Sequence, residues 1–548
     1  MSSRSSNTGS SHLVAALIES GVERLFSLSG NQILSIYDAC LDAGLEIIHV
    51  RHEAAAVHMA DAWGRLTGRP GVALLTAGPG HANGLSALFV ARQSESPLVV
   101  LSGQSARADD GRGAFQEMPQ AELAQPLAKA AWTAEDSASL GGDVRRALDL
   151  AVRGRPGPVA VSLPSDVLEA QVPRSDDAFA NSELPTLTEA GQHRIGELLD
   201  TAQRPMILAG PAMMRPPASD YLEQLESTAG VPVVATESPR GVNDPSLGAF
   251  AEVLAQADVV LLLGKRLDHS LQFGAPPLFA ADACFAQVDA DVAELDRTTS
   301  NVRPPQQLAI AVQAHPGQAA GQIAAAAGSA RHESWRDAVR AAVAHRPAAW
   351  DSWQSPPQGP LHPIEVCQSI GPWVDDGIVV IDGGEFGQWA QALLSGRRRV
   401  VNGPAGSIGT SIPFALTARL FDPDAPVVAI QGDGTIGFHL LEFDTAVRHN
   451  LPFVAIVGND AGWNAERRLQ ARTYGEDRIF ACDLLPTRYD LAVAALGGHG
   501  EHVTKRSELD TALERAFASG LPSLVNVAIE PTEAPIVRRN GAPAPTGH

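Results

Sequence analysis

Cysteine is scarce in this sequence, with only Cys40, Cys284, Cys367 and Cys482 among 548 residues. No two of them form a CxxC pair, which argues against a zinc site of the usual spacing and against a disulfide framework. We therefore expect reduced thiols in a cytoplasmic protein.

Positive charge and long apolar runs are also in short supply. Lysine and arginine number 41 against 62 aspartates and glutamates, a formal net charge of −21. This balance argues against a non-specific nucleic-acid binder, although a local pocket can still be positive. No uninterrupted apolar stretch approaches the ~18 residues of a membrane span. The polar start MSSRSSNTGSSH lacks the apolar core of a signal peptide. We expect neither a nucleic-acid nor a membrane partner.

Short apolar runs that alternate with helical patterns are abundant. In the first region Val72–Thr76 and Pro97–Ser102 read as buried strands, and Ala54–Leu66 reads as an Ala-rich helix. Such alternation predicts a parallel α/β sheet. A chain of 548 residues has room for about three domains.

Two polar or proline-rich stretches divide the chain. Residues 172–189 and 347–363 read as linkers, and Ala319–Ala330 reads as a surface helix. The sequence therefore predicts three parallel-sheet α/β domains, of which the first and third look similarly built. Their expected limits are 10–171, 190–346 and 360–535.

The sharpest motif lies in the third region. Val427–Gln431 reads as a strand that runs into GDGT, residues 432–435, and a second strand, Phe453–Val457, runs into Gly458, Asn459 and Asp460. Carboxylates at the ends of parallel strands make a plausible site for a hard cation. Glycines in such a turn let backbone N–H groups approach a phosphate closely. The pattern predicts a divalent cation between Asp433, Asp460 and a diphosphate.

The stretch GDGTIGFHLLEFDTAVRHNLPFVAIVGND resembles the metal–diphosphate motif of thiamine diphosphate enzymes of the acetolactate synthase type. The resemblance runs from Leu13 to about Ile529. It implies thiamine diphosphate and Mg²⁺ as cofactors. The second asparagine of the family motif is Asp460 here, which adds negative charge at the metal. The implied metal ligands are Asp433, Asp460 and the carbonyl of Gly462, and Gly432, Gly434 and Thr435 are implied at the diphosphate.

A second motif, IIHVRHE, runs into Glu53 and resembles the family's glutamate motif. The family uses this carboxyl beside the cofactor's aminopyrimidine ring, where proton exchange with a ring nitrogen turns the exocyclic amine into a base. A glutamate at a helix start is also favoured by the helix dipole. The metal motif and the GPGHANG segment, Gly78–Gly84, favour the catalytic role, and Asn83 is implied as a cofactor contact.

Two further segments carry the resemblance. GSIGTSIPFA is similar to the segment that bends the cofactor, with Ile408 as an apolar wedge and the carbonyl of Gly406 as an acceptor for the exocyclic amine. IDGGEFGQWA is similar to the segment near the diphosphate, with Glu385 and Phe386 at the contacting positions.

The implied substrate contacts lie mainly in the first region. Gly30 and Asn31 occupy the usual substrate loop, and AFQE matches a family segment. In that segment Phe115 would wall the pocket and Gln116 would hydrogen-bond a substrate oxygen as a catalytic group. A polar loop residue at a subunit interface explains Gln116 about as well.

The segment AGWNAERRLQARTYG resembles 2-hydroxyacyl-CoA lyases. It implies Trp463 in the substrate pocket and Glu466 as an acid/base group, with an exposed helical glutamate paired to Arg467 or Arg468 as the alternative. Our hypothesis is cleavage of a 2-hydroxyacyl-CoA to formyl-CoA and an aldehyde or ketone. The alternatives are an acetolactate synthase-like carboligase or 2-oxo-acid decarboxylase, and a non-catalytic family member, against which Glu53 argues.

The resemblance also implies an assembly. In this family the pyrimidine-binding N-terminal domain and the diphosphate-binding C-terminal domain that form one site belong to different subunits, so a homodimer or homotetramer is expected. The central Rossmann-like domain holds FAD, ADP or nothing in relatives. Gly264–Asp268 lies where such relatives contact a nucleotide, and we expect an empty structural domain rather than a bound nucleotide.

Overall fold

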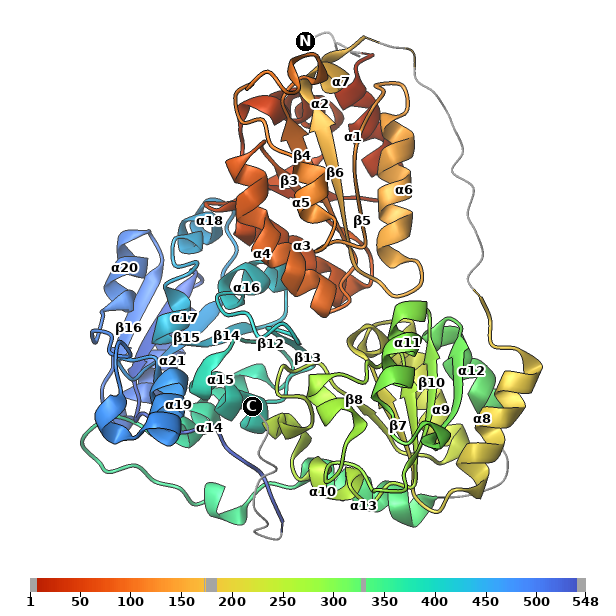
Figure 1. Ribbon diagram of the computed structural model, residues 1–548. Coiled ribbons are helices and arrows are strands. Elements are labelled where there is room, and N and C mark those ends of the chain that lie inside the picture. The colour runs from red at the N-terminus through yellow and green to blue at the C-terminus, as the bar shows by residue number, and fades with distance from the viewer. Residues whose placement is uncertain (1–6, 172, 174–184, 327–331, 540–548) are drawn as a thin grey trace.

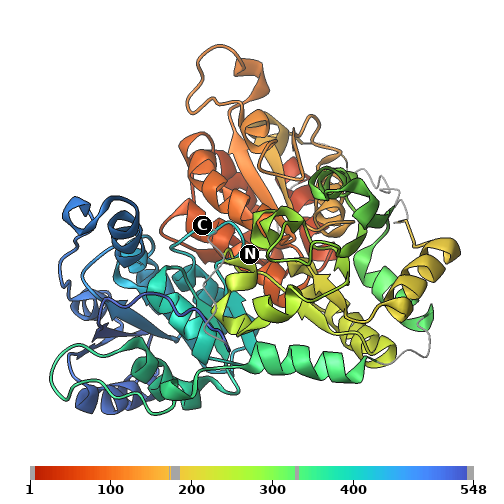
Figure 2. The ribbon, with the colours of Figure 1, turned by 60° about the horizontal axis from the view of Figure 1, so that its bottom comes forward.

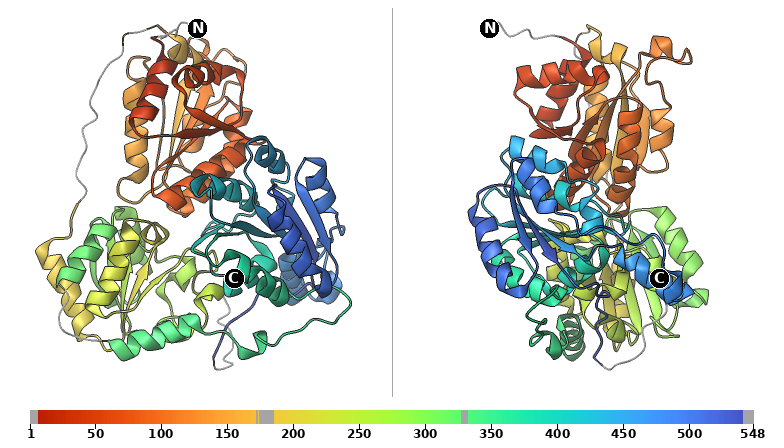
Figure 3. Two further views of the ribbon diagram at one scale, coloured as in Figure 1. Left: turned by 180° about the vertical axis from the view of Figure 1, so that it is seen from behind. Right: turned by 90° about the vertical axis from the view of Figure 1, so that its left-hand side faces the viewer.

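The computed structural model describes residues 7–171, 173, 185–326 and 332–539. Three parallel sheets form three lobes around a common centre, one lobe for each of the first, central and third domains (Figures 1, 2 and 3). The predicted fold class is therefore confirmed. The domain limits 10–171, 190–346 and 360–535 remain predictions, and each encloses one sheet.

The first sheet has the strand order β2-β1-β3-β4-β6-β5, with every neighbouring pair parallel. Its strands are β1 (Arg24–Ser27), β2 (Glu46–His49), β3 (Gly71–Leu75), β4 (Leu98–Gln104), β5 (Ala130–Thr133) and β6 (Pro158–Pro164). Its helices are α1 (Gly9–Glu19), α2 (Leu34–Ala43), α3 (Glu53–Thr67), α4 (Pro79–Gln93), α5 (Gln120–Ala124), α6 (Leu140–Val152) and α7 (Ser165–Glu169).

The third sheet repeats this topology strand for strand, with the order β13-β12-β14-β15-β17-β16, which confirms that the first and third domains are similarly built. Its strands are β12 (Ile378–Ile381), β13 (Arg398–Val401), β14 (Val427–Gly432), β15 (Val454–Asn459), β16 (His499–Val503) and β17 (Ser523–Ala528). Its helices are α14 (Pro363–Val374), α15 (Gly384–Leu393), α16 (Ser411–Phe421), α17 (Asp433–Ile436), α18 (Glu442–Arg448), α19 (Asn464–Tyr474), α20 (Tyr489–Ala495) and α21 (Arg506–Ala518).

The central sheet has the order β11-β10-β9-β7-β8, a doubly wound arrangement. Its strands are β7 (Pro205–Ala209), β8 (Val233–Ala235), β9 (Val259–Leu263), β10 (Cys284–Asp289) and β11 (Leu308–Gln313). Its helices are α8 (Glu189–Thr201), α9 (Ala218–Ala229), α10 (Phe250–Leu254), α11 (Val292–Asn301), α12 (Pro316–Ala326) and α13 (Glu333–Ala344).

The expectation of a surface helix over Ala319–Ala330 needs correction. The helix α12 starts earlier, at Pro316, and buries Ala319, Ala320 and Ile323 against the central core. Small alanines let α12 pack closely on α9. Residues 327–330 of the expected range lie outside the described residues.

The first and third domains share one continuous apolar core. Helix α3 is buried on all sides, and its Met59 and Ala62 belong to the same cluster as Phe414 and Ala415 of α16. The two helices lie against each other where the first and third lobes meet (Figure 1). Helix α3 begins where the His52 side chain accepts a hydrogen bond from the Ala54 N–H, and it ends at Gly68, whose φ of 70° is left-handed. This packing fixes α3 relative to the third domain.

Candidate functional site

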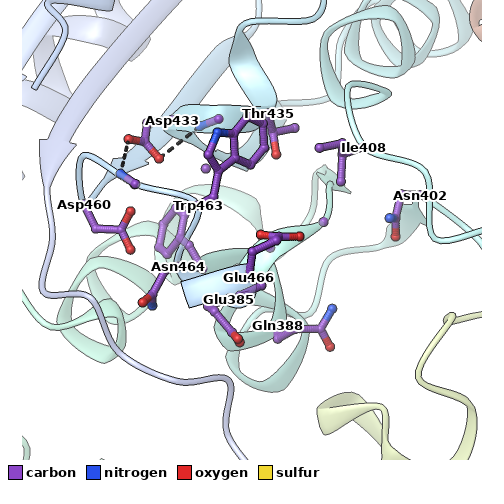
Figure 4. A pocket seen from close by; sticks show the side chains of 18 of the residues that line it. Glu385, Gln388, Asn402, Ile408, Asp433, Thr435, Asp460, Trp463, Asn464 and Glu466 are labelled. Atoms are coloured by element: carbon purple, nitrogen blue, oxygen red, sulfur yellow. Dashed lines mark hydrogen bonds between the residues drawn. The ribbon is translucent and has the colours of Figure 1, made fainter. Parts of the chain in front are cut away.

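A cleft of about 390 Å³ opens at the carboxyl ends of β12, β14 and β15 (Figure 4). Its volume is that of a small-molecule site, and its position is where ligands bind to open parallel sheets. Most of the predicted cofactor and metal residues line it, namely Glu385, Phe386, Gly406, Ile408, Gly432, Asp433, Gly434, Thr435, Asp460 and Gly462. The predicted substrate residue Trp463 and the predicted acid/base Glu466 line it as well.

Two carboxylates lie at one end of the cleft. Asp433 accepts hydrogen bonds from the backbone N–H groups of Gly434 (3.0 Å) and Gly462 (3.1 Å). Burial raises the pKa of Asp433 to about 6. Burial and then the charge of Asp433 raise the pKa of Asp460 to about 7. The two carboxylates thus disfavour each other's charge, and a cation between them would relieve that repulsion.

The backbone around these carboxylates suits a metal and a diphosphate. The backbone hydrogen bonds between this turn and residues 482–484 involve Ala461 and Trp463, the two neighbours of Gly462. The carbonyl of Gly462 takes no part in these bonds. No atom lies within 4 Å of the place where a Cβ on Gly432 or Gly384 would sit, which leaves open space over both glycines. Carboxylates, a carbonyl and bare glycine backbone are a donor set that fits Mg²⁺ with a diphosphate.

The loop at residues 402–410 forms the opposite wall. Ile408 packs over Gly383, where an added Cβ would lie 2.6 Å from Ile408 Cγ2. Gly406 has a φ of 66°, a left-handed conformation that favours glycine. The predicted apolar wedge and carbonyl acceptor therefore both border the cleft.

Glu385 is tied to other parts of the chain. Its carboxylate accepts a hydrogen bond from the Ala534 N–H (2.6 Å) and lies 3.7 Å from the Arg240 guanidinium. Burial raises the pKa of Glu385, and Arg240 opposes the shift. Trp389 donates to the carbonyl of Glu533 (2.9 Å), so residues 533 and 534 lie along α15 beside the cleft.

Trp463 and Glu466 lie at the start of α19. The Trp463 ring packs on Gly434, where an added Cβ would lie 2.6 Å from the ring. Glu466 is exposed to the cleft (Figure 4). The arginines proposed to pair with it are engaged elsewhere, Arg467 with Asp483 and Arg468 with the carbonyl of Pro531. Among the described residues Glu466 has no hydrogen-bond or ion-pair partner, so the pairing alternative is not supported.

Sequence reasoning missed several polar groups in the cleft. Gln388, Asn402 and Asn464 are buried, and the side-chain carbonyl oxygen of each has no hydrogen-bond partner in the described protein. Gln388 lies one helical turn after Glu385, a spacing that could have identified it. Arg240 and Asn243 come from the central domain, and no local motif signals their approach to the third sheet.

The predicted residues of the first domain form a separate cluster around the loop after β3. Asn83 donates to the Glu53 carboxylate (3.0 Å), and a Cβ on Gly80 would lie 3.3 Å from the same carboxylate. A Cβ on Gly30 would lie 2.2 Å from Thr76 Oγ1, so Gly30 contacts the first residue of this loop. Glu53, Asn83 and Gly30 therefore lie near the carboxyl ends of the first sheet's strands. The exposed Asn31 follows Gly30.

Gln116 and Phe115 belong to the same cluster. Gln116 has a strained φ of 62°, and a Cβ on Gly78 would lie 2.9 Å from its backbone oxygen. Phe115 is 72% exposed, an unusual position for a large apolar ring. His81 is buried and paired with Ser102 (2.8 Å), and burial lowers its pKa to about 4. A neutral, enclosed imidazole is poorly suited to transfer protons to a substrate.

The two clusters occupy equivalent ends of two sheets with the same topology. The cleft is lined by residues between Pro239 and Ile529, and no residue of the first domain's described part is among them. Within one chain, Glu53 is therefore not brought to the metal end of the cleft.

A second cavity of about 220 Å³ lies between the central sheet and the first domain. There Arg155 forms ion pairs with Glu95 and Asp289, and the Ala212 N–H donates to Glu95 (3.1 Å). Of the predicted nucleotide segment only Gly264 borders this cavity. Lys265 is buried and donates to Ser270 (3.0 Å).

No helix in the described ranges is long and apolar enough to cross a membrane.

Comparison with known proteins identifies the relatives of this chain. A probable acetolactate synthase of Mycobacterium bovis is 36% identical over 94% of each chain. A 2-hydroxyacyl-CoA lyase 2 of Bos taurus is 31% identical over 96% of this chain and 91% of its own. A 2-hydroxyacyl-CoA lyase of Oryza sativa is 30% identical over 95% of each.

Three family models match in succession. They describe the N-terminal thiamine pyrophosphate (thiamine diphosphate) binding domain over residues 7–123, the central domain over 193–319, and the C-terminal binding domain over 382–527. The recognised family is thereby confirmed. This chain belongs to the thiamine pyrophosphate enzymes and is a thiamine diphosphate-dependent carbon–carbon lyase or transferase.

Proposed function

We propose that the protein cleaves a 2-hydroxyacyl-CoA into formyl-CoA and an aldehyde or ketone. The observation that carries the proposal is the Glu466 carboxylate, which faces the cleft without a hydrogen-bond or ion-pair partner in the described chain. An unpaired carboxylate is available to take up a proton, whereas one held in an ion pair is not. Relatives at 30–31% identity that are named 2-hydroxyacyl-CoA lyases support this choice.

The proposed division of labour follows the two clusters. When bound, thiamine diphosphate supplies a nucleophilic carbon and accepts the electron pair of the bond that breaks. Asp433, Asp460 and the Gly462 carbonyl would hold Mg²⁺ at one end of the cleft, and Ile408 would support the cofactor from the other. Glu53 of the partner subunit exchanges a proton with the pyrimidine ring, and Asn83 orients that carboxyl.

Glu466 accepts the proton of the substrate hydroxyl as the carbon–carbon bond breaks, and that hydroxyl carbon leaves as the carbonyl product. The proton then returns to the carbon that becomes formyl-CoA, so atoms balance. Trp463 lines the same cleft, with its ring on Gly434. Gln116 and Phe115 of the partner subunit border the substrate. This assignment requires at least a homodimer, and a homotetramer would meet the same requirement.

A carboligase acting on 2-oxo acids is the second candidate. The 36% identity to a probable acetolactate synthase, over 94% of both chains, favours it. The fold and the metal end of the cleft serve both reactions equally, so the substrate distinguishes them.

For the central domain we propose a structural role without a nucleotide. At its cavity Arg155 already pairs with Glu95 and Asp289, and Arg215 donates to the backbone carbonyls of Glu95 and Ser94. The absorption spectrum of the purified protein, and nucleotide analysis after its denaturation, test this directly. Stoichiometric flavin or ADP would contradict it.

The deciding experiment supplies a 2-hydroxyacyl-CoA in one reaction and pyruvate in another, each with thiamine diphosphate and Mg²⁺. We expect formyl-CoA from the first. Glu466→Gln should lower this turnover by about 10²–10⁴-fold without changing cofactor affinity. Glu476→Gln, an exposed glutamate outside the cleft, is the matched control. Consumption of pyruvate alone, with acetolactate or acetaldehyde as product, would replace the lyase by the carboligase.

A further inference from the structure

The loop at residues 402–410 shapes the cleft, yet few of its own contacts hold it in place. It follows β13 and precedes α16, and it carries Gly406 and Ile408. Inside the loop, Asn402 donates to the carbonyl of Ser407 (2.7 Å), and the Gly406 N–H donates to the carbonyl of Gly403 (3.1 Å). Further support has to come from outside the loop.

Within the third domain, the Asn402 N–H donates to the carbonyl of Ile381 (3.1 Å), and the Thr410 hydroxyl donates to Asp382 (3.3 Å). Further support comes from helix α3 of the first domain. Arg65 donates from Nη1 to the carbonyl of Val401 (2.6 Å), the residue directly before the loop. The other edge of the same guanidinium donates to the Asp61 carboxylate, from Nε to Oδ1 (2.8 Å) and from Nη2 to Oδ2 (2.6 Å). This fork geometry fixes the plane of the guanidinium, so Nη1 has one direction in which to donate.

Close packing reinforces this contact. A Cβ on Gly403 would lie 2.2 Å from Ser94 Oγ and 3.1 Å from Arg65 Nη1, so the loop backbone sits directly on the first domain. The Arg65 guanidinium lies 4.9 Å from the ring centre of Phe414 in α16, a cation–π distance.

The far end of the loop is held by His439 of the third domain, which in turn contacts α3. His439 Nδ1 lies 2.5 Å from the carbonyl of Gly409, so this nitrogen carries the proton and donates. The His439 ring packs edge-on against His58 of α3, with 5.6 Å between ring centres. Helix α3 therefore contacts the start of the loop directly through Arg65 and its far end only through His439.

The burial of Arg65 and Asp61 indicates that their ion pair positions the loop rather than stabilising the fold. The side chains of Arg65 and Asp61 are 5% and 0% exposed. Removing two charges from water offsets most of their attraction, so a buried ion pair adds little net stability over apolar side chains of similar volume. What Asp61 and Arg65 provide that apolar residues cannot is a directed hydrogen bond to Val401.

We propose that Asp61 and Arg65 are positioning residues that hold loop 402–410 in the shape that accepts the bent cofactor. The proposal rests on thiamine diphosphate binding in the cleft, as in the proposed function. It assigns to α3 a task in the cleft of its own chain, separate from the task of Glu53 at the helix start.

The test compares Arg65→Met and Arg65→Lys with Arg419→Met. Arg419 also donates to backbone carbonyls, but to those of Pro452 and Pro423 (both 2.6 Å), which lie outside loop 402–410. Hydrogen exchange of residues 402–410 is measured in the full chain without cofactor, and thiamine diphosphate affinity is measured by calorimetry with Mg²⁺. We expect Arg65→Met to speed exchange in the loop and weaken cofactor affinity, each about 10-fold or more.

Arg65→Lys should recover part of both losses, because lysine keeps the charge but cannot donate to Asp61 and Val401 in one plane. If Arg65→Met does not fold, Arg65→Lys and Asp61→Asn provide the same comparison. Exchange and affinity changes no larger than those of Arg419→Met would overturn the proposal. Should the unaltered protein bind no thiamine diphosphate, the proposed function fails, while the exchange measurement still tests the support of the loop by α3.

Discussion

The separation of Glu53 from the cleft leads to a test by subunit complementation. Glu53→Gln removes proton exchange at the first-domain cluster, and Asp433→Ala removes a carboxylate at the third-domain cleft. We expect each variant alone to lose at least about 10²-fold in turnover. In a heterodimer of the two variants with sites between subunits, one site carries both defects and the other carries none. Such a dimer should regain about half of normal activity, or roughly a quarter in randomly assembled tetramers.

The assay purifies the mixed assembly through two different affinity tags and measures turnover per active-site pair. Recovery to a quarter of normal activity would stand at least about 25-fold above either variant alone. The matched control combines Asp433→Ala chains with Glu466→Gln chains, which place both defects in the same cleft-forming domain. These mixtures should show no recovery. If the Glu53→Gln and Asp433→Ala mixture also stays inactive although both tags co-purify, each site is completed within one chain and our assignment of Glu53 to the partner subunit is wrong.

Other expectations follow from single contacts. Asp460→Ala should weaken thiamine diphosphate affinity by about 10-fold or more in calorimetry with Mg²⁺ and change turnover little at saturating cofactor; an unchanged affinity would remove Asp460 from the metal site. Gly434→Ala places a Cβ 2.6 Å from the Trp463 ring, so it should lower cofactor affinity through displacement of that ring, and Trp463→Ala in the same chain should restore part of the loss. Phe414→Ala should destabilise the protein by about 3–5 kcal/mol in urea unfolding, because this fully buried ring joins the first and third domains. Burial lowers the pKa of His81 to about 4, so between pH 6.5 and 4 the unfolded chain binds a proton that the folded chain does not, and stability falls as the pH falls. His81→Asn should reduce the slope of unfolding free energy against pH by up to about 1.4 kcal/mol per pH unit. An unchanged slope would show that His81 is not the group with the lowered pKa.

The sequence predicted the elements whose own residues determine them. The apolar run Pro97–Ser102, expected as a buried strand, forms most of β4 (Leu98–Gln104), in which every residue is buried. Strands with polar or partly exposed residues, such as His499–Val503 at a sheet edge, carry no such run and were not predicted. Their place is set by pairing with β17, a contact between distant parts of the chain.

The site shows the same division between local and long-range information. The GDG turn identified Asp433, because a strand, a glycine turn and a carboxylate are adjacent in sequence. Arg240 reaches Glu385 only through the packing of the central domain on the third, and Arg65 reaches Val401 only through the packing of α3 on α16. Neither contact has a local signature, so sequence patterns alone could not reveal them.

Helix α3 is enclosed along its whole length, and this limits how its sequence can change over evolutionary time. Ala55, Ala56 and Ala60 have no exposed surface, and a Cβ on Gly71 would lie 2.1 Å from the carbonyl of Ala60. A larger residue at these positions has no space, and a polar one has no water. At its two ends Glu53 and Arg65 have separate partners, Asn83 and Val401. Drift in this helix therefore requires compensating changes in the first domain and in the third domain at once, and we expect α3 to tolerate fewer single substitutions than any solvent-facing helix of the described chain.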